Sequence, residues 1–111
     1  MKQEEYIKHI YEAIENVLCI SEEMLKSPKR TAKHNDARKI FSYLCRVNGI
    51  PYSTIGETIN RGYHTVSYQV ETFVESIKFD KVLFTRYCEV KSYIENKLKT
   101  QNAKILKKKE R

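Results

Sequence analysis

The chain contains 111 residues, of which 21 are basic and 14 acidic, so its formal net charge is +7. This length fits one domain around a single hydrophobic core and excludes a second core of similar size. A hydrophobic share of 41% excludes a disordered chain, and the positive charge favours a polyanionic partner.

The N-terminal segment has the apolar spacing of an amphipathic helix. Its apolar residues recur at intervals of three and four, with charges between them: Ile7, Ile10, Tyr11, Ile14, Val17 and Leu18. This spacing predicts a helix over about 4–18 with one buried stripe. After a break at Cys19 and Ile20, Ser21 can cap a short helix. That helix ends before Pro28, because the residue preceding a proline is disfavoured in the helical conformation.

A basic loop and a strong helix come next. The loop, residues 27–35, contains Lys29, Arg30, Lys33 and His34. The helix is predicted to start at a cap formed by Asn35 or Asp36. Its apolar face comprises Ala37, Ile40, Phe41, Leu44 and Val47. Gly49 stands where a helix commonly ends in a left-handed residue.

The central segment has the element lengths of a helix-turn-helix. A short helix at 53–59 with Ser53 as its cap, a turn at 60–62 and a longer helix from about residue 64 fit this arrangement. The longer helix is predicted to bury Val66, Val70, Phe73, Val74 and Ile77. In a helix-turn-helix, the first residues of the second helix meet base edges in the major groove. Here these residues carry hydrogen-bonding groups that the core does not need: Tyr63, His64, Thr65, Ser67 and Tyr68.

The C-terminal segment combines one more helix with a strongly basic end. Asp80 is predicted to cap this helix, whose buried face comprises Leu83, Tyr87, Val90, Ile94 and Leu98. Residues 96–111 carry a net charge of +6, which leaves only +1 for residues 1–95. We therefore predict an all-α chain of about six helices, with a single helical DNA-binding domain over 1–100 and a basic, frayed tail over 101–111.

Several motifs in this order resemble a known family. CISEEMLKS at 19–27 precedes the basic loop, and ARKIFSYLCR at 37–46 is similar to a helix with the pattern AR-x-x-A-x-Y-L. IPYSTIG at 50–56 is similar to a helix-turn-helix opening with a hydrophobic residue, four residues of any type and then Ile-Gly. NRGYHTV at 60–66 is similar to the signature G-R-D-H-[ST]-T-V. Together the motifs resemble the C-terminal DNA-binding domain of the bacterial replication initiator DnaA, in the Trp-repressor-like helix-turn-helix class. The resemblance covers about residues 11–98.

This resemblance implies roles for individual residues on double-stranded DNA. Arg30 lies where the family inserts an arginine into the minor groove, and Lys29 and Arg38 lie at positions near the DNA backbone. Arg61 falls on the signature arginine, and Thr65 falls on a threonine that faces DNA. With the loop and helix residues above, the predicted DNA-binding set is Lys29, Arg30, Lys33, Arg38, Ser53, Arg61, Tyr63, His64, Thr65 and Tyr68.

The sequence also departs from the family pattern. Gly62 and Tyr63 stand in place of the Asp-His pair that reads bases, so we expect a target other than the DnaA box or a looser specificity. The 111 residues contain no GxxxxGK[ST] phosphate loop. We therefore expect a protein related to replication initiation or regulation that lacks the ATPase module, either a stand-alone relative or a fragment.

Other classes of function have less support. The scattered histidines and three cysteines form no catalytic or metal-ligand spacing, so no enzyme activity, cofactor or metal site is predicted. No apolar run approaches the roughly 20 residues of a membrane helix, and a cytoplasmic location without membrane contact is expected. RNA binding lacks its glycine-aromatic signature. Two alternatives remain: a protein-interaction module, as a homodimer or with a replication protein, and a Trp-repressor-like transcriptional regulator.

Overall fold

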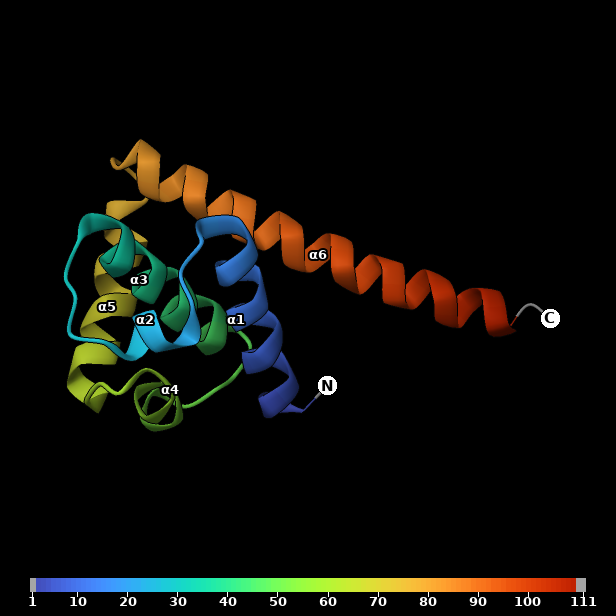
Figure 1. Ribbon diagram of the computed structural model, residues 1–111, viewed down its shortest axis with the longest axis horizontal. Helices are drawn as coiled ribbons and strands as arrows, with labels where there is room; N and C mark the ends of the chain where they lie inside the picture. The colour runs from blue at the N-terminus through green and yellow to red at the C-terminus, as the bar shows by residue number, and fades with distance from the viewer. Residues whose placement is uncertain (1, 110–111) are drawn as a thin grey trace.

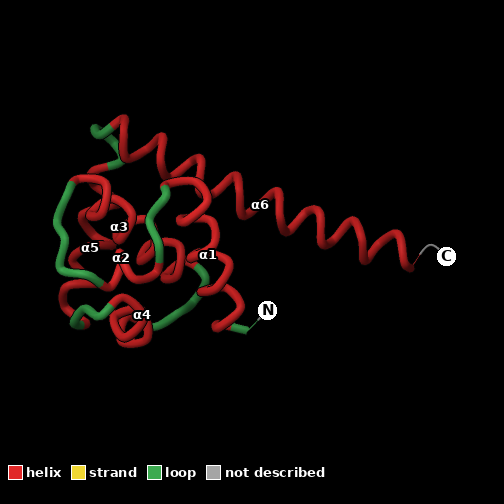
Figure 2. The backbone as a smooth tube through the Cα atoms, viewed as in Figure 1, coloured by secondary structure: helices red, strands yellow, loops and turns green. Residues whose placement is uncertain are grey.

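The computed structural model describes the backbone of residues 2–109 and the side chains of residues 2–98. Six helices follow one another along the chain (Figure 1): α1 (Gln3–Leu18), α2 (Glu22–Lys26), α3 (Ala32–Val47), α4 (Tyr52–Ile59), α5 (Tyr63–Ser76) and α6 (Lys81–Lys109). The described backbone contains helices and loops but no strand (Figure 2). The predicted all-α class with about six helices is therefore confirmed.

Helix α3 is the centre of the fold. It contacts each of the other five helices, and α6 packs across α1 before continuing away from them (Figure 1). An ion pair of 2.7 Å between Arg86 and Asp36 joins α6 to α3, and a second between Lys97 and Glu12 joins α6 to α1. Helices α4 and α5 pack against each other and against α3, and the Phe73 ring of α5 also contacts the Tyr87 ring of α6.

The hydrophobic core draws side chains from all six helices. Its largest fully buried apolar members are Ile10, Ile14, Leu25, Ile40, Phe41, Ile50, Ile55, Ile59, Val66, Phe73 and Leu83. Two valines predicted for the core are exposed instead, Val47 by 58% and Val74 by 40%. Val47 is the last residue of α3, where the chain turns away. Val74 follows Phe73 directly, and consecutive helical residues point about 100° apart, so only one of the two faces inward.

Two of the predicted helix caps are confirmed. The Ser21 hydroxyl accepts from the backbone N–H of Met24 at 3.3 Å, and the Asp80 carboxylate accepts from the N–H of Leu83 at 3.0 Å. The predicted left-handed conformation of Gly49 is also present, with φ of 84°.

The predicted cap of α3 at Asn35 or Asp36 is wrong. Helix α3 begins at Ala32, and the hydroxyl of Thr31 caps it by accepting from the His34 N–H at 3.3 Å. Thr31 supplies the same capping oxygen one turn earlier, and the intervening residues tolerate a helix. The basic loop is therefore shorter than predicted, and Lys33 lies on the first turn of α3.

The predicted cap of α4 at Ser53 is also wrong. Helix α4 begins at Tyr52, with Pro51 in the N-cap position and no side-chain cap. Pro51 has an extended backbone and no N–H of its own, so it starts the helix one residue earlier. Ser53 is then an exposed residue inside α4.

Helix α6 is longer than the sequence interpretation expected. Its predicted end near Gln101 differs from the structure, in which α6 extends to Lys109. No glycine or proline follows Gly62, and Lys, Gln, Ala and Leu favour helices, so no residue in this segment stops one. Residues 110–111 lie outside the described residues, and the division into a domain over 1–100 and a tail over 101–111 stays a prediction. Within the described part, no helix is both long and apolar enough to cross a membrane.

Candidate nucleic-acid interface

Helices α4 and α5 and the turn between them form the predicted helix-turn-helix. Asn60 ends α4 in the left-handed conformation, with φ of 57°, and the N–H of Arg61 donates to the carbonyl of Gly56 at 2.8 Å. A Cβ atom added to Gly56 would lie 2.4 Å from the carbonyl oxygen of Arg61. This turn is therefore tight enough to require glycine at position 56.

A basic cleft lies between the loop before α3 and the exposed face of α5. Its volume is about 410 Å³, and its lining residues are Arg30, Asn35, Arg38, Lys39, Arg61, Thr65, Tyr68 and Gln69. Of these lining residues four are cationic and none is acidic. Because Arg30 and Thr65 line one cleft, the prediction that the basic loop and the start of α5 share one face is confirmed.

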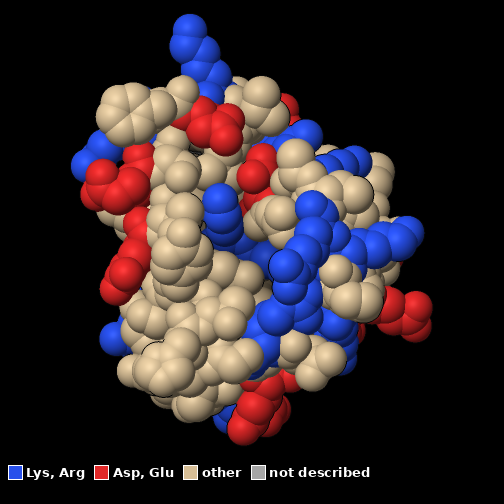
Figure 3. All heavy atoms as spheres, turned by 90° about the vertical axis from the view of Figure 1, so that its left-hand side faces the viewer, with Lys and Arg blue, Asp and Glu red and all other residues tan. Residues whose placement is uncertain are grey.

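The charge distribution on this side of the molecule agrees with the positive charge of the cleft lining. Figure 3 turns the left-hand side of Figure 1, where α5 and the loop before α3 lie, toward the viewer. On this face Lys and Arg gather in a band at the centre and right, while Asp and Glu lie mainly around the margin (Figure 3). A polyanion that approaches this face therefore meets positive potential where the cleft opens.

The buried side chain of Arg38 organises the basic loop. Arg38 is only 2% exposed. Its guanidinium donates to backbone carbonyls at 2.6–3.1 Å, those of Met24, Leu25, Ser27 and Lys29, and to the Asn35 side chain at 3.3 Å. Burial and the nearby Arg61 and Arg30 cations lower the pKa of the Arg38 guanidinium. This burial does not fit the predicted contact of Arg38 with the DNA backbone, because its donors are occupied by the end of α2.

Arg61 holds the same end of α2 from the helix-turn-helix side. Its Nη2 donates to the carbonyl of Ser27 at 2.5 Å, and its Nη1 donates to the carbonyl of Lys26 at 3.3 Å. The last carbonyls of a helix lack intrahelical partners and carry partial negative charge, so they suit arginine donors. Arg38 and Arg61 together fix the basic loop relative to the turn that precedes α5.

The predicted residues on α5 are exposed at its first two turns. Tyr63 and Tyr68 are exposed by 53% and 68%, and His64 and Thr65 are also exposed. Tyr63 makes an edge contact with Tyr52 of α4, with ring centroids 5.7 Å apart. Only Thr65 and Tyr68 of this group line the cleft, so Tyr63 and His64 lie on the neighbouring outer surface of α5.

The remaining predicted residues do not line the cleft. Lys29, Lys33 and Ser53 are exposed on the loop, on α3 and on α4 respectively. His34 follows Lys33 on the first turn of α3, and its Nδ1 atom lies 2.5 Å from the Thr31 hydroxyl. Burial and nearby cations, chiefly Arg38, lower the pKa of His34, so the neutral imidazole is favoured there.

Three residues that line the cleft were missed by the sequence interpretation: Asn35, Lys39 and Gln69. Gln69 is four residues after Thr65, so one more helical turn along the exposed face of α5 would have identified it. The sequence predicted Asn35 as a helix cap, and the spacing of apolar residues in α3 does not distinguish Lys39 from a solvent-exposed lysine. Their role depends on how α3 packs against the loop.

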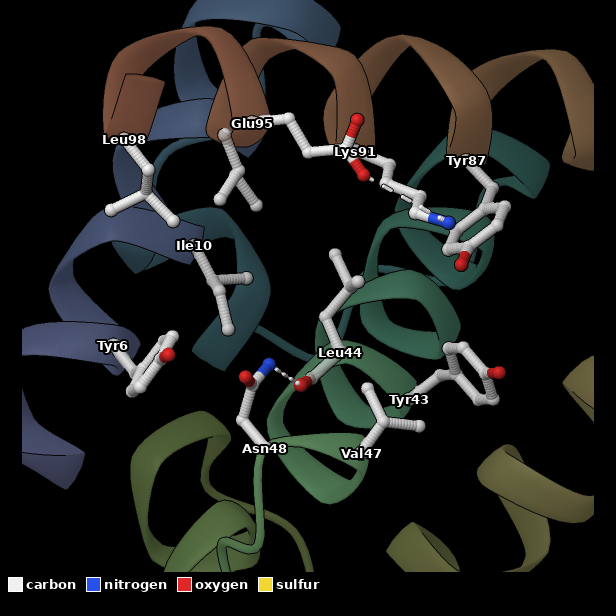
Figure 4. Close-up of a pocket in the computed structure, with 11 residues that line it drawn as sticks. Tyr6, Ile10, Tyr43, Leu44, Val47, Asn48, Tyr87, Lys91, Glu95 and Leu98 are labelled. Atoms are coloured by element: carbon white, nitrogen blue, oxygen red, sulfur yellow. Dashed lines mark hydrogen bonds and ion pairs between the residues drawn. The ribbon is translucent and has the colours of Figure 1, made fainter. Parts of the chain in front are cut away.

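A second hollow, of about 350 Å³, lies where α6 crosses α1 and α3 (Figure 4). Its lining is mostly apolar or aromatic, including Ile10, Leu44, Tyr43, Tyr87 and Leu98. Lys91 and Glu95 face each other at its α6 side, 4.0 Å apart (Figure 4). This hollow offers one cation that is already paired, so it does not suit a polyanion.

Comparison with known proteins gives one family. The model of the bacterial dnaA protein helix-turn-helix family matches residues 7–72, which is more than half of the chain. The matched segment contains most of α1, all of α2, α3 and α4, the turn and most of α5. Comparison with curated proteins and with solved structures gave no match.

Proposed function

The chain belongs to the bacterial DnaA helix-turn-helix family, and from this premise we propose that it binds double-stranded DNA with a sequence preference. In this proposal the start of α5 enters the major groove, while the basic loop enters the adjacent minor groove. The observation that carries the proposal is the shared cleft, which holds Arg30 on one wall and Thr65 on the other.

The exposed start of α5 supplies the groups that read bases. His64, Thr65 and Tyr68 offer an imidazole, two hydroxyls and a methyl group, and all three are exposed. Major-groove edges present acceptors, donors and the thymine methyl in a pattern that differs for each base pair. Since Gly62 and Tyr63 stand where the family pattern has Asp and His, the preferred sequence differs from the family's own.

The basic loop supplies affinity and a preference for DNA with a narrow minor groove. Arg30 is exposed and lines the basic cleft. It also lines an adjoining basic hollow together with Lys26 and Arg61. An arginine in the minor groove favours narrow A·T-rich segments, where the negative potential is strongest. We therefore assign Arg30 to the minor groove and Lys29 and Lys33 to flanking phosphates.

The family favours a role in replication initiation or in regulation. A second candidate function is protein interaction, through a second copy or a replication protein. The observation that favours it is the apolar hollow between α1, α3 and α6, beside the exposed Val47.

Replacing Arg30 with alanine tests the proposed DNA binding. Affinity for labelled duplexes is measured by fluorescence anisotropy across a series of salt concentrations. We expect Arg30→Ala to weaken binding to all duplexes, more strongly where the flanks are A·T-rich, and to lower the magnitude of the salt slope, because a cation in the minor groove also displaces condensed counterions.

Lys8→Ala is the matched control, because it removes one positive charge from the exposed face of α1. We expect it to change the affinity and the salt slope less than Arg30→Ala does. If the unsubstituted chain binds no duplex at low salt, or binds duplex RNA as tightly as DNA, the proposed function is wrong. If both variants lost the same affinity, binding would depend on the total positive charge of the protein and not on the position of Arg30.

A further inference from the structure

The amide of Gln69 is held in one orientation by a buried serine. Ser42 of α3 is fully buried, and its hydroxyl donates to Oε1 of Gln69 at 3.0 Å. Gln69 itself is half-buried and lines the basic cleft. Because the acceptor end of the amide is occupied by Ser42, the Nε2 group with its two N–H donors is the end that remains for a ligand.

The chemistry around this amide selects an anion. A glutamine that reads adenine needs both its oxygen and its nitrogen free for a bidentate contact. The Oε1 atom of Gln69 is directed at the buried Ser42 hydroxyl, which already occupies one of its lone pairs, and the neighbours of Gln69 in the cleft include Lys39, Arg61 and Arg30. Donors surrounded by cations suit the oxygens of a phosphate and offer little discrimination between bases.

The place of Gln69 in the cleft points to one particular phosphate position. If α5 lies in the major groove and Arg30 lies in the adjacent minor groove, one sugar-phosphate backbone separates the two. The cleft between α5 and the loop must then straddle that backbone. Gln69 lies one turn beyond Thr65 on the cleft side of α5, and Lys39 lies on the α3 side.

From these observations, and resting on the proposed function, we propose that Gln69, oriented by Ser42, binds a phosphate of the DNA strand that passes between the two grooves. Lys39 contributes the neighbouring positive charge. Gln69 thus fixes how far α5 enters the major groove, and it does so equally on every sequence. Ser42 is a positioning residue for this contact, because it touches the amide and not the DNA.

Replacement of Gln69 tests the phosphate contact. The parent's preferred duplex, selected from random DNA, and a scrambled duplex are titrated with the parent, with Gln69→Ala and with Gln69→Glu. We expect Gln69→Ala to weaken binding to both duplexes by about tenfold, the loss for a hydrogen bond to a charged group. Gln69→Glu should weaken it further, because it replaces the donors with a negative charge.

Gln3→Glu is the charge-matched control, since it makes the same chemical change on the exposed start of α1. It should alter affinity less than twofold. Lys39→Ala should lower the magnitude of the salt slope by about 0.9, whereas the uncharged change Gln69→Ala should leave the slope unaltered. Circular dichroism and thermal unfolding verify that each variant remains folded.

A scan of the preferred duplex with single neutral methylphosphonate linkages locates the phosphate. We expect one linkage at which the parent loses more affinity than Gln69→Ala does, because the variant has already lost the amide contact and keeps only Lys39 near that phosphate. Ser42→Ala should lose part of the same affinity, and combining it with Gln69→Ala should add little, as expected for two residues that act through one contact.

The outcomes separate the two proposals. If the parent binds no duplex, the proposed function fails, and this inference fails with it. If the parent binds duplex DNA but Gln69→Ala and Gln69→Glu bind as tightly as the parent, only the phosphate contact is wrong. A Gln69→Ala protein that prefers a different sequence would show that Gln69 reads a base, which also overturns the inference.

Discussion

Replacing Arg38 with methionine is expected to lower the free energy of unfolding by about 3 kcal/mol or more. The guanidinium donates to four backbone carbonyls from Met24 to Lys29, and methionine donates to none of them. The carbonyls of Met24 and Ser27 keep other donors, but those of Leu25 and Lys29 lose the donor that Arg38 supplies, and each buried acceptor left without a partner costs roughly 1–3 kcal/mol. Urea unfolding followed by circular dichroism measures the loss.

Arg46→Met is the matched control for this change, because Arg46 is an exposed arginine near the end of the same helix. Its effect should be about 1 kcal/mol or less, because Arg46 loses only an exposed contact of its guanidinium with the Tyr52 ring, 4.6 Å from the ring centroid. Arg38→Lys should be intermediate, since a lysine keeps the charge but lacks the forked geometry. If Arg38→Met kept the parent's stability and lost only DNA affinity, Arg38 would be a direct DNA contact, as its sequence position suggested.

Replacing Gly56 with alanine should destabilise the helix-turn-helix by about 1–3 kcal/mol, the cost of overpacking a closed site. At most helical positions this substitution stabilises by about 0.5–1 kcal/mol, because alanine favours the helix. Here the sign reverses, because the new methyl would lie 2.4 Å from the backbone oxygen of Arg61, and backbone moves less readily than a side chain. Thermal and urea unfolding measure the change.

Gly62→Ser provides the comparison for Gly56→Ala. Gly62 is the N-cap of α5, has φ of −73°, and has nothing within 4 Å of the position of an added Cβ. Serine is a good N-cap, so Gly62→Ser should leave stability unchanged or raise it slightly. If Gly56→Ala proved as stable as the parent, the tight approach between α4 and Arg61 would not be a requirement of the fold.

Much of the fold follows from local patterns in the sequence. The apolar spacing of α1, and the caps Ser21 and Asp80, predict elements that the structure contains, because each depends on residues only a few positions apart. The cap of α3 could not be chosen in the same way. Thr31 and Asn35 are both good caps, and Asn35 instead donates from its side chain to the carbonyl of Arg30 at 3.2 Å.

The candidate site was predictable only where it follows helical periodicity. Thr65 and Tyr68 could be placed on the exposed face of α5 from the positions of the buried valines alone. Arg38 could not be placed, because the carbonyls that it binds belong to α2 and to the loop after it, 9 to 14 residues earlier in the chain. The orientation of the Gln69 amide likewise depends on Ser42, a residue on a different helix.

The central claim is that α5 reads bases, and the specificity ratio of substituted proteins tests it most directly. The ratio is the affinity for the selected duplex divided by that for random duplex, measured for the parent, His64→Ala, Thr65→Ala and the exposed α6 control Thr85→Ala. We predict that His64→Ala and Thr65→Ala each lose about 1–3 kcal/mol on the selected duplex and little on random DNA, while Thr85→Ala matches the parent. Folded His64→Ala and Thr65→Ala proteins with the parent's ratio would contradict the claim.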